Sequence, residues 1–374
     1  MSDDVHPEPD RVDGAPHPRE TPALIGQGPA ERAFLDAYGA DRLHHGWLIT
    51  GPRGLGKATL AWRIARFLLA TPAAGDDGLF GAPPPPQTLD IAADHPVMRR
   101  TLAMSEPGLK LVRRGWDDKA KRLRAVITVD EVRDVKQFFA LSSTDGGRRV
   151  VIVDAADEMN PNAANAILKL LEEPPARTTL LLVSHQPARL LPTIRSRCRE
   201  LRLSPLSPDD MATALQQAGV TVLPDQAAAL SQLSAGSVGD AIRLLNLDGL
   251  ALYASLVAVL ASLPDLDRPR AIALAESTAG RGAEARLDLL VTLLDIALAR
   301  LARTGVIGAP PDLQAAPDEA RILSRLAPDA RAGRLWAQLA QTSGDRLRHG
   351  RAVNLDPANL VLDTLLHMQA TARP

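Results

Sequence analysis

A stretch of ten residues that begins at Gly51, GPRGLGKATL, could bind a phosphate group. The pattern G-x-x-x-x-G-K-[ST] of phosphate-binding loops is met by Gly51, Gly56 and Lys57, but the eighth position is Ala58. In such a loop the backbone N–H groups and the lysine hold the β- and γ-phosphates, and the hydroxyl at the eighth position holds magnesium. Ala58 has no oxygen to offer, so the stretch keeps only half of an ATPase site.

The residues on both sides of the loop fit this interpretation. An apolar run at residues 47–50 predicts a strand, and apolar side chains recur at helical spacing from Leu60 to Leu68. Strand, glycine loop and helix is the context that a phosphate loop requires. Thr59 has a hydroxyl, but one residue turns a side chain by about 100° around a helix, away from the ion. The candidate phosphate-binding residues are Gly51, Pro52, Arg53, Gly54, Leu55, Gly56, Lys57, Ala58 and Thr59.

Polar side chains end two further apolar runs. RRVVIVDAADEMN contains a strand that ends in Asp154, and TTLLLVSHQP contains one that ends in Ser184. In a working ATPase the strand-end aspartate supports magnesium and an adjacent glutamate activates water. Here Ala155 is the adjacent residue, and Asp157 and Glu158 are explained as acids at the start of a helix. Asp154 and Ser184 complete the candidate nucleotide-binding set.

Alternating arginines follow in TIRSRCREL, which begins at Thr193. An isolated Arg195, Arg197 or Arg199 is usually a solvated surface group. Three arginines at the end of an α/β layer could instead serve a phosphate on a neighbouring molecule. The residue types alone leave both interpretations open.

A basic stretch with one tryptophan, KLVRRGWDDKAKRLR, begins at Lys110 and ends at Arg124. It could touch DNA phosphates, but Asp117 and Asp118 interrupt its charge, which favours a solvated hairpin or loop. The whole chain has a formal net charge of -1, which does not indicate a protein that coats nucleic acid by itself.

Strands alternate with helices through the first half of the chain. We expect a short helix at residues 29–38, a strand at 150–153 and a helix at 162–172 that the EEPP sequence ends. ITVDEVRDVKQFFALSS predicts a short strand that leads into a helix. This alternation favours a parallel α/β sheet. After about Pro205 the pattern is helical, and stretches such as ARLDLLVTLLDIALARLA predict a helical bundle.

The remaining segments bound the protein's class. The first 20 residues are acidic and rich in proline, so we expect a disordered tail. The tail lacks the features of a secretion signal, and no apolar run approaches the ~18 residues of a membrane span, so we expect a cytoplasmic protein without membrane contact. GAPPPP, ending at Pro86, predicts a loop or linker. Cys198 is the only cysteine and the eight histidines show no metal-ligand spacing, so we expect no metal site.

These pieces, in this order, resemble the clamp-loader branch of the AAA+ ATPases from about Pro22 to the C-terminus. PALIGQ, ending at Gln27, is similar to the nucleotide-base region of that family, and VVIVDAADEMNPNAANAILKLLEEPP is similar to its acidic strand and following helix. SRC, at residues 196–198, is similar to the family's arginine-finger motif and is the most specific sign. GSVGDAIRLL resembles the lid region, and AVNLDPANLVLDTLL resembles the end of the collar domain.

The resemblance implies three domains after a disordered tail at residues 1–20. An AAA+ P-loop α/β domain would span residues 21–205. A small helical lid domain would span 206–263, and a helical collar domain that holds partners together would span 264–374.

The departures from the family pattern concern hydrolysis. The motor subunits of the family have Thr or Ser at position 58, Glu at position 155 and an arginine in the place of Gly239. Many relatives also have a four-cysteine zinc module between the phosphate loop and the acidic strand, and this chain has no cysteine there. We therefore expect ATP binding without hydrolysis at most, and no zinc.

The resemblance then implies a silent member of a ring of five subunits. Arg197 would act in trans on ATP held by the adjoining motor subunit, and the ring would place a sliding clamp on primed DNA. One alternative is an active motor that uses Thr59 and Asp157 as substitutes. Another is a DNA-binding replication factor that works alone through the stretch from Lys110 to Arg124.

Overall fold

The computed structural model describes residues 7–40, 42–71, 86–140, 147–280, 282–353 and 355–373. These residues form two compact units. Unit 1 comprises Met1–Val220 together with Ser237–Gly239, and unit 2 comprises Thr221–Gly236 and Asp240–Pro374. The two units do not separate a lid from a collar, so the predicted division into three domains stays a prediction. All but Pro86 of the predicted GAPPPP linker lies outside the described residues.

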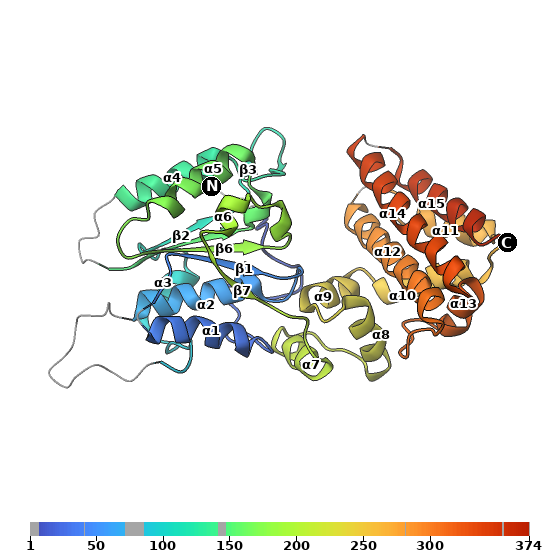
Figure 1. The fold of residues 1–374 in the computed structure, drawn as a ribbon, viewed down its shortest axis with the longest axis horizontal. Helices are drawn as coiled ribbons and strands as arrows, with labels where there is room; N and C mark the ends of the chain where they lie inside the picture. Colours follow the sequence, from blue (N-terminus) through green and yellow to red (C-terminus); the bar gives the residue numbers. More distant parts are fainter. Residues whose placement is uncertain are drawn as a thin grey trace, which may run out of the picture. The chain divides into compact units, whose positions relative to one another are not determined.

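A five-stranded parallel sheet is the centre of unit 1 (Figure 1). Its order is β2-β5-β6-β1-β7, and every neighbouring pair is parallel. The strands are β1 (Gly46–Thr50), β2 (Leu109–Val112), β5 (Arg149–Asp154), β6 (Thr178–Ser184) and β7 (Arg199–Arg202). Because parallel strands end at one edge, the last residues of β1, β5 and β6 meet there. Thr50 pairs with Ser184, and Asp154 pairs with Val183.

Helices cover both faces of this sheet (Figure 1). One apolar core joins the sheet to α1 (Gly28–Gly39) and α2 (Lys57–Ala70), and the other joins it to α4 (Val129–Ala140) and α5 (Pro161–Glu172). Burial on both faces explains why β5 and β6 are continuous apolar runs rather than alternating ones. The predicted P-loop parallel sheet is therefore confirmed.

Short elements complete unit 1. They are α3 (Pro96–Leu102), the antiparallel pair β3 (Trp116–Asp117) and β4 (Arg122–Leu123), η1 (Ala156–Glu158), η2 (Pro187–Arg189), α6 (Pro192–Arg195) and α7 (Pro208–Gln217). The predicted strand before α4 is reduced to one bridge, between Ile127 and Met159.

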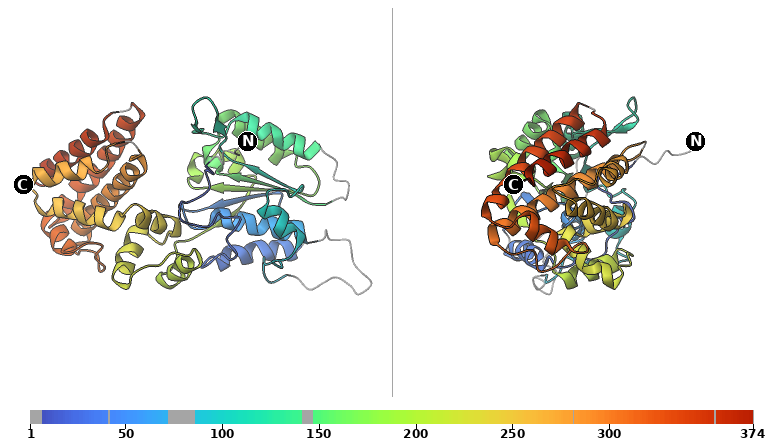
Figure 2. Two further views of the ribbon diagram at one scale, coloured as in Figure 1. Left: turned by 180° about the vertical axis from the view of Figure 1, so that it is seen from behind. Right: turned by 90° about the vertical axis from the view of Figure 1, so that its right-hand side faces the viewer.

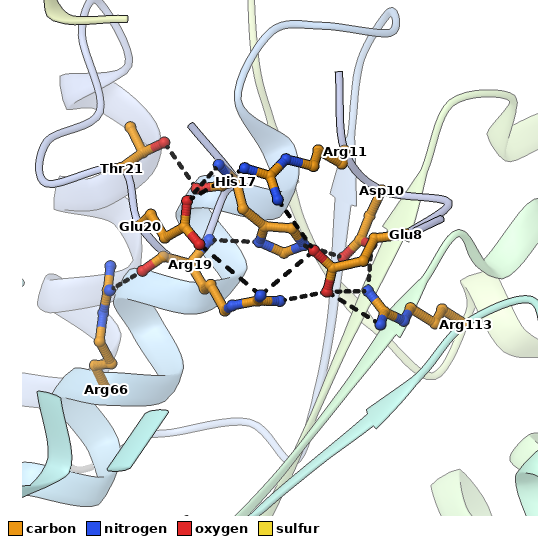
Figure 3. Close-up of polar contacts among 9 residues, drawn as sticks. All are labelled: Glu8, Asp10, Arg11, His17, Arg19, Glu20, Thr21, Arg66 and Arg113. Atoms are coloured by element: carbon orange, nitrogen blue, oxygen red, sulfur yellow. Dashed lines mark hydrogen bonds and ion pairs between the residues drawn. The ribbon is translucent and has the colours of Figure 1, made fainter. Parts of the chain in front are cut away.

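The predicted disordered tail is wrong for residues 7–20, which pack on unit 1. His17 is fully buried, and the chain around it forms turns rather than a helix or strand. The prediction used only the polar composition of this stretch. Charged partners from distant parts of the chain satisfy its polar groups and make its burial favourable (Figure 3).

The described part of unit 2 consists of helices and their connections, as predicted from the sequence (Figure 2). Its helices are α8 (Pro224–Ser234), α9 (Val238–Asn246), α10 (Gly249–Ala261), α11 (Arg268–Glu276), α12 (Glu284–Ile307), α13 (Glu319–Leu326), α14 (Ala330–Ala352) and α15 (Pro357–Thr371); the first two residues of α9 belong to unit 1. The two longest helices, α12 and α14, lie side by side. A Cβ on Gly305 or Gly333 would come within 2.8 Å of the other helix's backbone, so glycine permits this close crossing.

Among the described residues, no single helix is long and apolar enough to cross a membrane; α9 and α10, bent by 79° at the break between them, reach that length and apolarity only when taken together.

Candidate phosphate-binding site and arginine finger

The glycine loop lies between β1 and α2, in the context that the sequence predicted. Gly51, Gly54 and Gly56 have φ angles of 138°, 71° and 87°, a region that side chains with a Cβ rarely adopt. Gly56 is the N-cap of α2, so the loop leads directly into the N-terminus of a helix. Free N–H groups at a helix N-terminus favour an anion. The geometry is that of a phosphate cradle.

The lysine of the loop is buried and directed inward. Lys57 is 3% exposed, and its Nζ donates a hydrogen bond to the carbonyl oxygen of Pro52 in the same loop. Thr59 is also buried, whereas Ala58 is half-buried.

Three further residues of unit 1 pack against the loop. A Cβ on Gly56 would lie 2.5 Å from a methyl group of Leu24, so the predicted base region does lie beside the loop. Ser237 Oγ donates to the carbonyl of Arg53 at 2.9 Å, and the N–H of Gly239 donates to the carbonyl of Gly54 at 3.1 Å. A Cβ on Gly239 would lie 2.8 Å from the Gly54 Cα. An arginine at position 239 would therefore force these two segments apart.

Asp154 ends β5 and is only 8% exposed. Burial raises the pKa of its carboxyl, and the nearby charges of Asp10 and Glu158 add to this, giving a value of about 7 against the opposing charge of Lys57. Near neutral pH the carboxyl is therefore protonated much of the time. A protonated carboxyl is a poor ligand for a hard cation such as magnesium.

The acids after Asp154 have structural partners. They lie in η1, a single 3-10 turn, and not at the start of an α-helix as predicted. Asp157 accepts a hydrogen bond from the N–H of His185 at 2.8 Å, which fixes the turn after β6. Glu158 pairs with Arg53 of the loop at 3.2 Å and with Arg114 at 2.8 Å. Neither carboxylate is free to replace the missing catalytic glutamate.

The site therefore lacks part of the usual ligand set for magnesium. Ala58 offers no oxygen, and Glu158 is engaged by two arginines. Within the described ranges, no group of three His, Cys, Asp or Glu side chains could hold a metal ion. The expectation that the chain binds no zinc stays a prediction.

The buried carboxyl predicts a specific pH dependence of stability. The pKa of Asp154 rises from a usual 3.8 to about 7 on folding. Between these values the folded state binds the extra proton, so stability falls as pH rises through that window and levels off above it. Relative to Asp154→Asn, the natural chain should lose stability between about pH 4 and about pH 7.

The measurement is urea unfolding of unit 1 in both proteins across that pH range. Asp118→Asn, a change at an exposed carboxylate, is the control and should keep the natural profile. Parallel profiles for the natural chain and Asp154→Asn would show that Asp154 titrates normally.

Ser184 and His185 lie at the adjacent strand end. Ser184 is fully buried, and its Oγ has no hydrogen-bond partner among the described residues. Burial lowers the pKa of His185 to about 4, helped by the charges of Lys57 and Arg53, so the imidazole is neutral. His185 was not among the predicted site residues, because its place directly after an apolar run is its only signal in the sequence.

The three arginines after β6 lie in three different environments. Arg197 lies 3.0 Å from Glu172 and donates to the carbonyl of Thr193 at 3.1 Å, while 39% of its side chain stays exposed. Arg195 is exposed, and Arg199 lies over the ring of Trp47 at 5.4 Å. The guanidinium of Arg197 is thus held by a carboxylate and a carbonyl and stays partly accessible, whereas that of Arg199 is held over an aromatic ring.

The neighbouring thiol is not reactive. Burial raises the pKa of Cys198 to about 12, so the thiol stays protonated.

The basic stretch forms β2, the β3–β4 pair and their connections, as the hairpin interpretation predicted. Its cations are largely paired with carboxylates: Lys110 with Asp134, Arg113 with Glu8 and Asp10, Arg114 with Glu158, and Arg124 with Glu131. Pairing leaves little net charge to attract DNA phosphates.

Comparison with known proteins gives the family. A family described as "DNA polymerase III, delta subunit" matches residues 26–207. DNA polymerase III subunit delta' of Pseudomonas aeruginosa is 39% identical over 225 residues, which are 59% of this chain and 61% of that one. The same subunit of Escherichia coli K12 is 35% identical over 268 residues, which are 71% and 73% of the two chains.

Among solved structures, a DNA polymerase III gamma subunit-related protein of Thermotoga maritima matches 91% of this chain and 100% of its own, at 16% identity and a TM-score of 0.38. That likeness adds nothing to the assignment. The phosphate loop, Asp154, Ser184 and Arg197 all lie within the residues that the family matches. With the identity to the Escherichia coli subunit, this shows that the chain belongs to the family of DNA polymerase III delta' subunits.

Proposed function

We propose that the chain is the delta' subunit of a clamp loader and that it is catalytically silent. It would stand in a hetero-pentamer with the motor subunits gamma/tau and the delta subunit. The pentamer would place the sliding clamp on primed DNA during replication. The observation that carries this proposal is the contrast between Arg197, held at the surface by Glu172 and Thr193, and a phosphate loop that has Ala58 in the place of a magnesium ligand.

Arg197 suits action on a neighbour's nucleotide. Glu172 and the Thr193 carbonyl hold the guanidinium at the surface, where a phosphate of a neighbouring molecule can reach it. Negative charge builds on the γ-phosphate oxygens during transfer, and a fixed guanidinium stabilises it. The pair with Glu172 is exposed, so a phosphate can replace it at small cost.

The chain's own loop would serve at most to bind a phosphate group. Lys57 and the N–H groups at the start of α2 would hold it. Hydrolysis would lack both a magnesium ligand at position 58 and a base after Asp154, because Asp157 supports the turn at His185.

The two rival functions lose support for separate reasons. An active motor needs Thr59 and Asp157 as substitutes, but Thr59 is buried within α2 and Asp157 is engaged. A stand-alone DNA-binding protein needs a basic surface, and most cations from Lys110 to Arg124 are paired.

Purified chain should show no ATP hydrolysis above background, with or without primed DNA. The reason is the combination of Ala58, Ala155 and Gly239 with the raised pKa of Asp154. The measurement is phosphate release, with Lys57→Ala as the control for a contaminating ATPase. Turnover of even a few ATP per minute that Lys57→Ala abolishes would overturn the silent role.

A further inference from the structure

The last turn of α5 is followed by two prolines, which leaves one of its carbonyl groups without a backbone donor. A carbonyl in a helix accepts a hydrogen bond from the N–H four residues later, or three residues later in a tightened last turn. For Leu171 these positions are Pro175 and Pro174, and proline has no N–H. The carbonyl of Leu171 therefore needs a donor from another part of the chain.

His45, directly before β1, supplies that donor. Its Nε2 lies 3.0 Å from the carbonyl oxygen of Leu171, and because a carbonyl only accepts, Nε2 carries a proton. Burial and the charge of His44 lower the pKa of His45, so near neutral pH the ring is neutral and its one proton is on Nε2. The two histidine rings stack with centroids 4.3 Å apart. His45 thus caps the C-terminus of α5.

The capped turn carries Glu172, the carboxylate that pairs with Arg197 at 3.0 Å. A carboxylate at the C-terminus of a helix lies beside the negative end of the helix dipole, so the helix itself does not favour it there. Without its donor, the carbonyl of Leu171 would turn toward water and the last turn would fray. The carboxylate of Glu172 would move with that turn.

The residues around His45 connect the sheet to Arg197. The carbonyl of His45 accepts from the N–H of Leu180 in β6 at 2.7 Å, so the backbone of His45 is fixed in the sheet. Gly46 lies between the end of α5 and the arginine: a Cβ on it would lie 2.7 Å from a methyl group of Leu171 and 3.2 Å from the carbonyl oxygen of Arg197. His45 therefore ties the helix end beside Arg197 to a fixed point of the sheet.

We infer that His45 is a positioning residue for Arg197: its hydrogen bond to the last turn of α5 sets the place of Glu172, and Glu172 directs the guanidinium toward the phosphates of a neighbour's nucleotide. An exposed ion pair adds little to stability, but it does set the direction of a long side chain. This role rests on the proposed function, since Arg197 acts only in the assembled loader. His45 itself touches no nucleotide.

The main test measures ATP hydrolysis, stimulated by clamp and primed DNA, in reconstituted loaders that sizing shows to be intact. His45→Leu removes the donor, whereas the amide of His45→Gln can donate from nearly the place of Nε2. Glu173→Gln, at an exposed carboxylate beside Glu172, is the matched control and should work at the natural rate.

We expect His45→Leu to slow hydrolysis by about three- to tenfold, and by less than Arg197→Ala does. A misplacement of about 1 Å can cost about a hundredfold at a single site, and only one of several sites is affected here. His45→Gln should restore most of the rate. A natural rate in His45→Leu, or a His45→Gln loader as slow as His45→Leu, would overturn the role of this hydrogen bond.

The same change in an Arg197→Ala loader separates positioning from general damage. If His45 acts through Arg197, His45→Leu should slow hydrolysis no further once Arg197 is alanine. Equal slowing in both backgrounds would overturn the positioning role. Intact Arg197→Ala loaders that work at the natural rate would be a different result, because they would overturn the proposed function itself.

Nitrogen NMR of the full chain with isotope-labelled histidine tests the hydrogen bond without the ring of subunits. The signals that His45→Gln removes belong to His45. Near neutral pH they should show a neutral ring with its proton on Nε2. A charged ring, or a proton on Nδ1 alone, would overturn the role of His45 whatever the loader assay gives.

Discussion

Replacing Arg197 by alanine should slow ATP hydrolysis by the assembled clamp loader without preventing assembly. An arginine supplied in trans is worth roughly a thousand- to a hundred-thousand-fold at a single site. The effect on the whole ring should be smaller, because this subunit would complete only one of several sites. The measurements are the ATPase rate stimulated by DNA and clamp, and the clamp-loading rate, on complexes shown by sizing to be intact.

The control variants follow from the three environments of the arginines. Arg195→Ala removes an exposed side chain and should leave both rates nearly unchanged. Arg199→Ala is a less clean control, because Arg199 lies over Trp47 and its loss could affect stability. Arg197→Lys should rescue little, since a point charge lacks the planar fork of a guanidinium. If intact Arg197→Ala complexes work at the natural rate, the trans-acting role is wrong and SRC is a structural remnant.

A chain cut after Val220 should remain folded as unit 1 and fail to enter the complex. The cut follows the division between the two units, whereas a cut near Pro264 would separate α10 from α12, which pack together. Unit 2 has apolar side chains beyond its own core, and Val306 and Ile307 at the end of α12 are each 60% exposed. We expect these side chains to contribute to the contacts with the partner subunits.

The shortened chain also loses Ser237 and Gly239, which donate to the carbonyls of Arg53 and Gly54. Each such hydrogen bond contributes about 0.5–1.5 kcal/mol, so unit 1 should be weakened but not unfolded. Circular dichroism and sizing of the fragment, alone and mixed with partner subunits, give the answer. A fragment that co-elutes with the partners would place the assembly surface in unit 1 instead.

The sequence predicted those parts of the fold that local pattern determines. β5, β6, α5 and the loop between β1 and α2 were expected because buried parallel strands are apolar runs and glycine loops have a fixed pattern. β7 was missed, since it is an edge strand in which only Leu201 of RELR is buried. Such a strand has no apolar run to detect.

The packing of residues 7–21 on unit 1 could not be predicted from the composition of that segment. Its composition is typical of disorder, and its stability comes from Arg113 and Arg66, which are roughly 50–100 residues away in sequence. Arg66 gave one weak indication of this packing. Its neighbours in the sequence predict a buried helix, and a buried arginine needs a hydrogen-bond partner from elsewhere in the chain. The raised pKa of Asp154 could not be predicted from the sequence either, since it depends on burial and on the charge of Asp10.

Reconstitution tests the central claim, membership of a clamp-loader ring, most directly. The full chain is mixed with gamma/tau and delta subunits of the same source and passed over a sizing column, with light scattering to give the mass of each peak. We predict one stable assembly that contains all three kinds of subunit and matches a pentamer. Elution of this chain alone, while the partners associate without it, would contradict the proposed function.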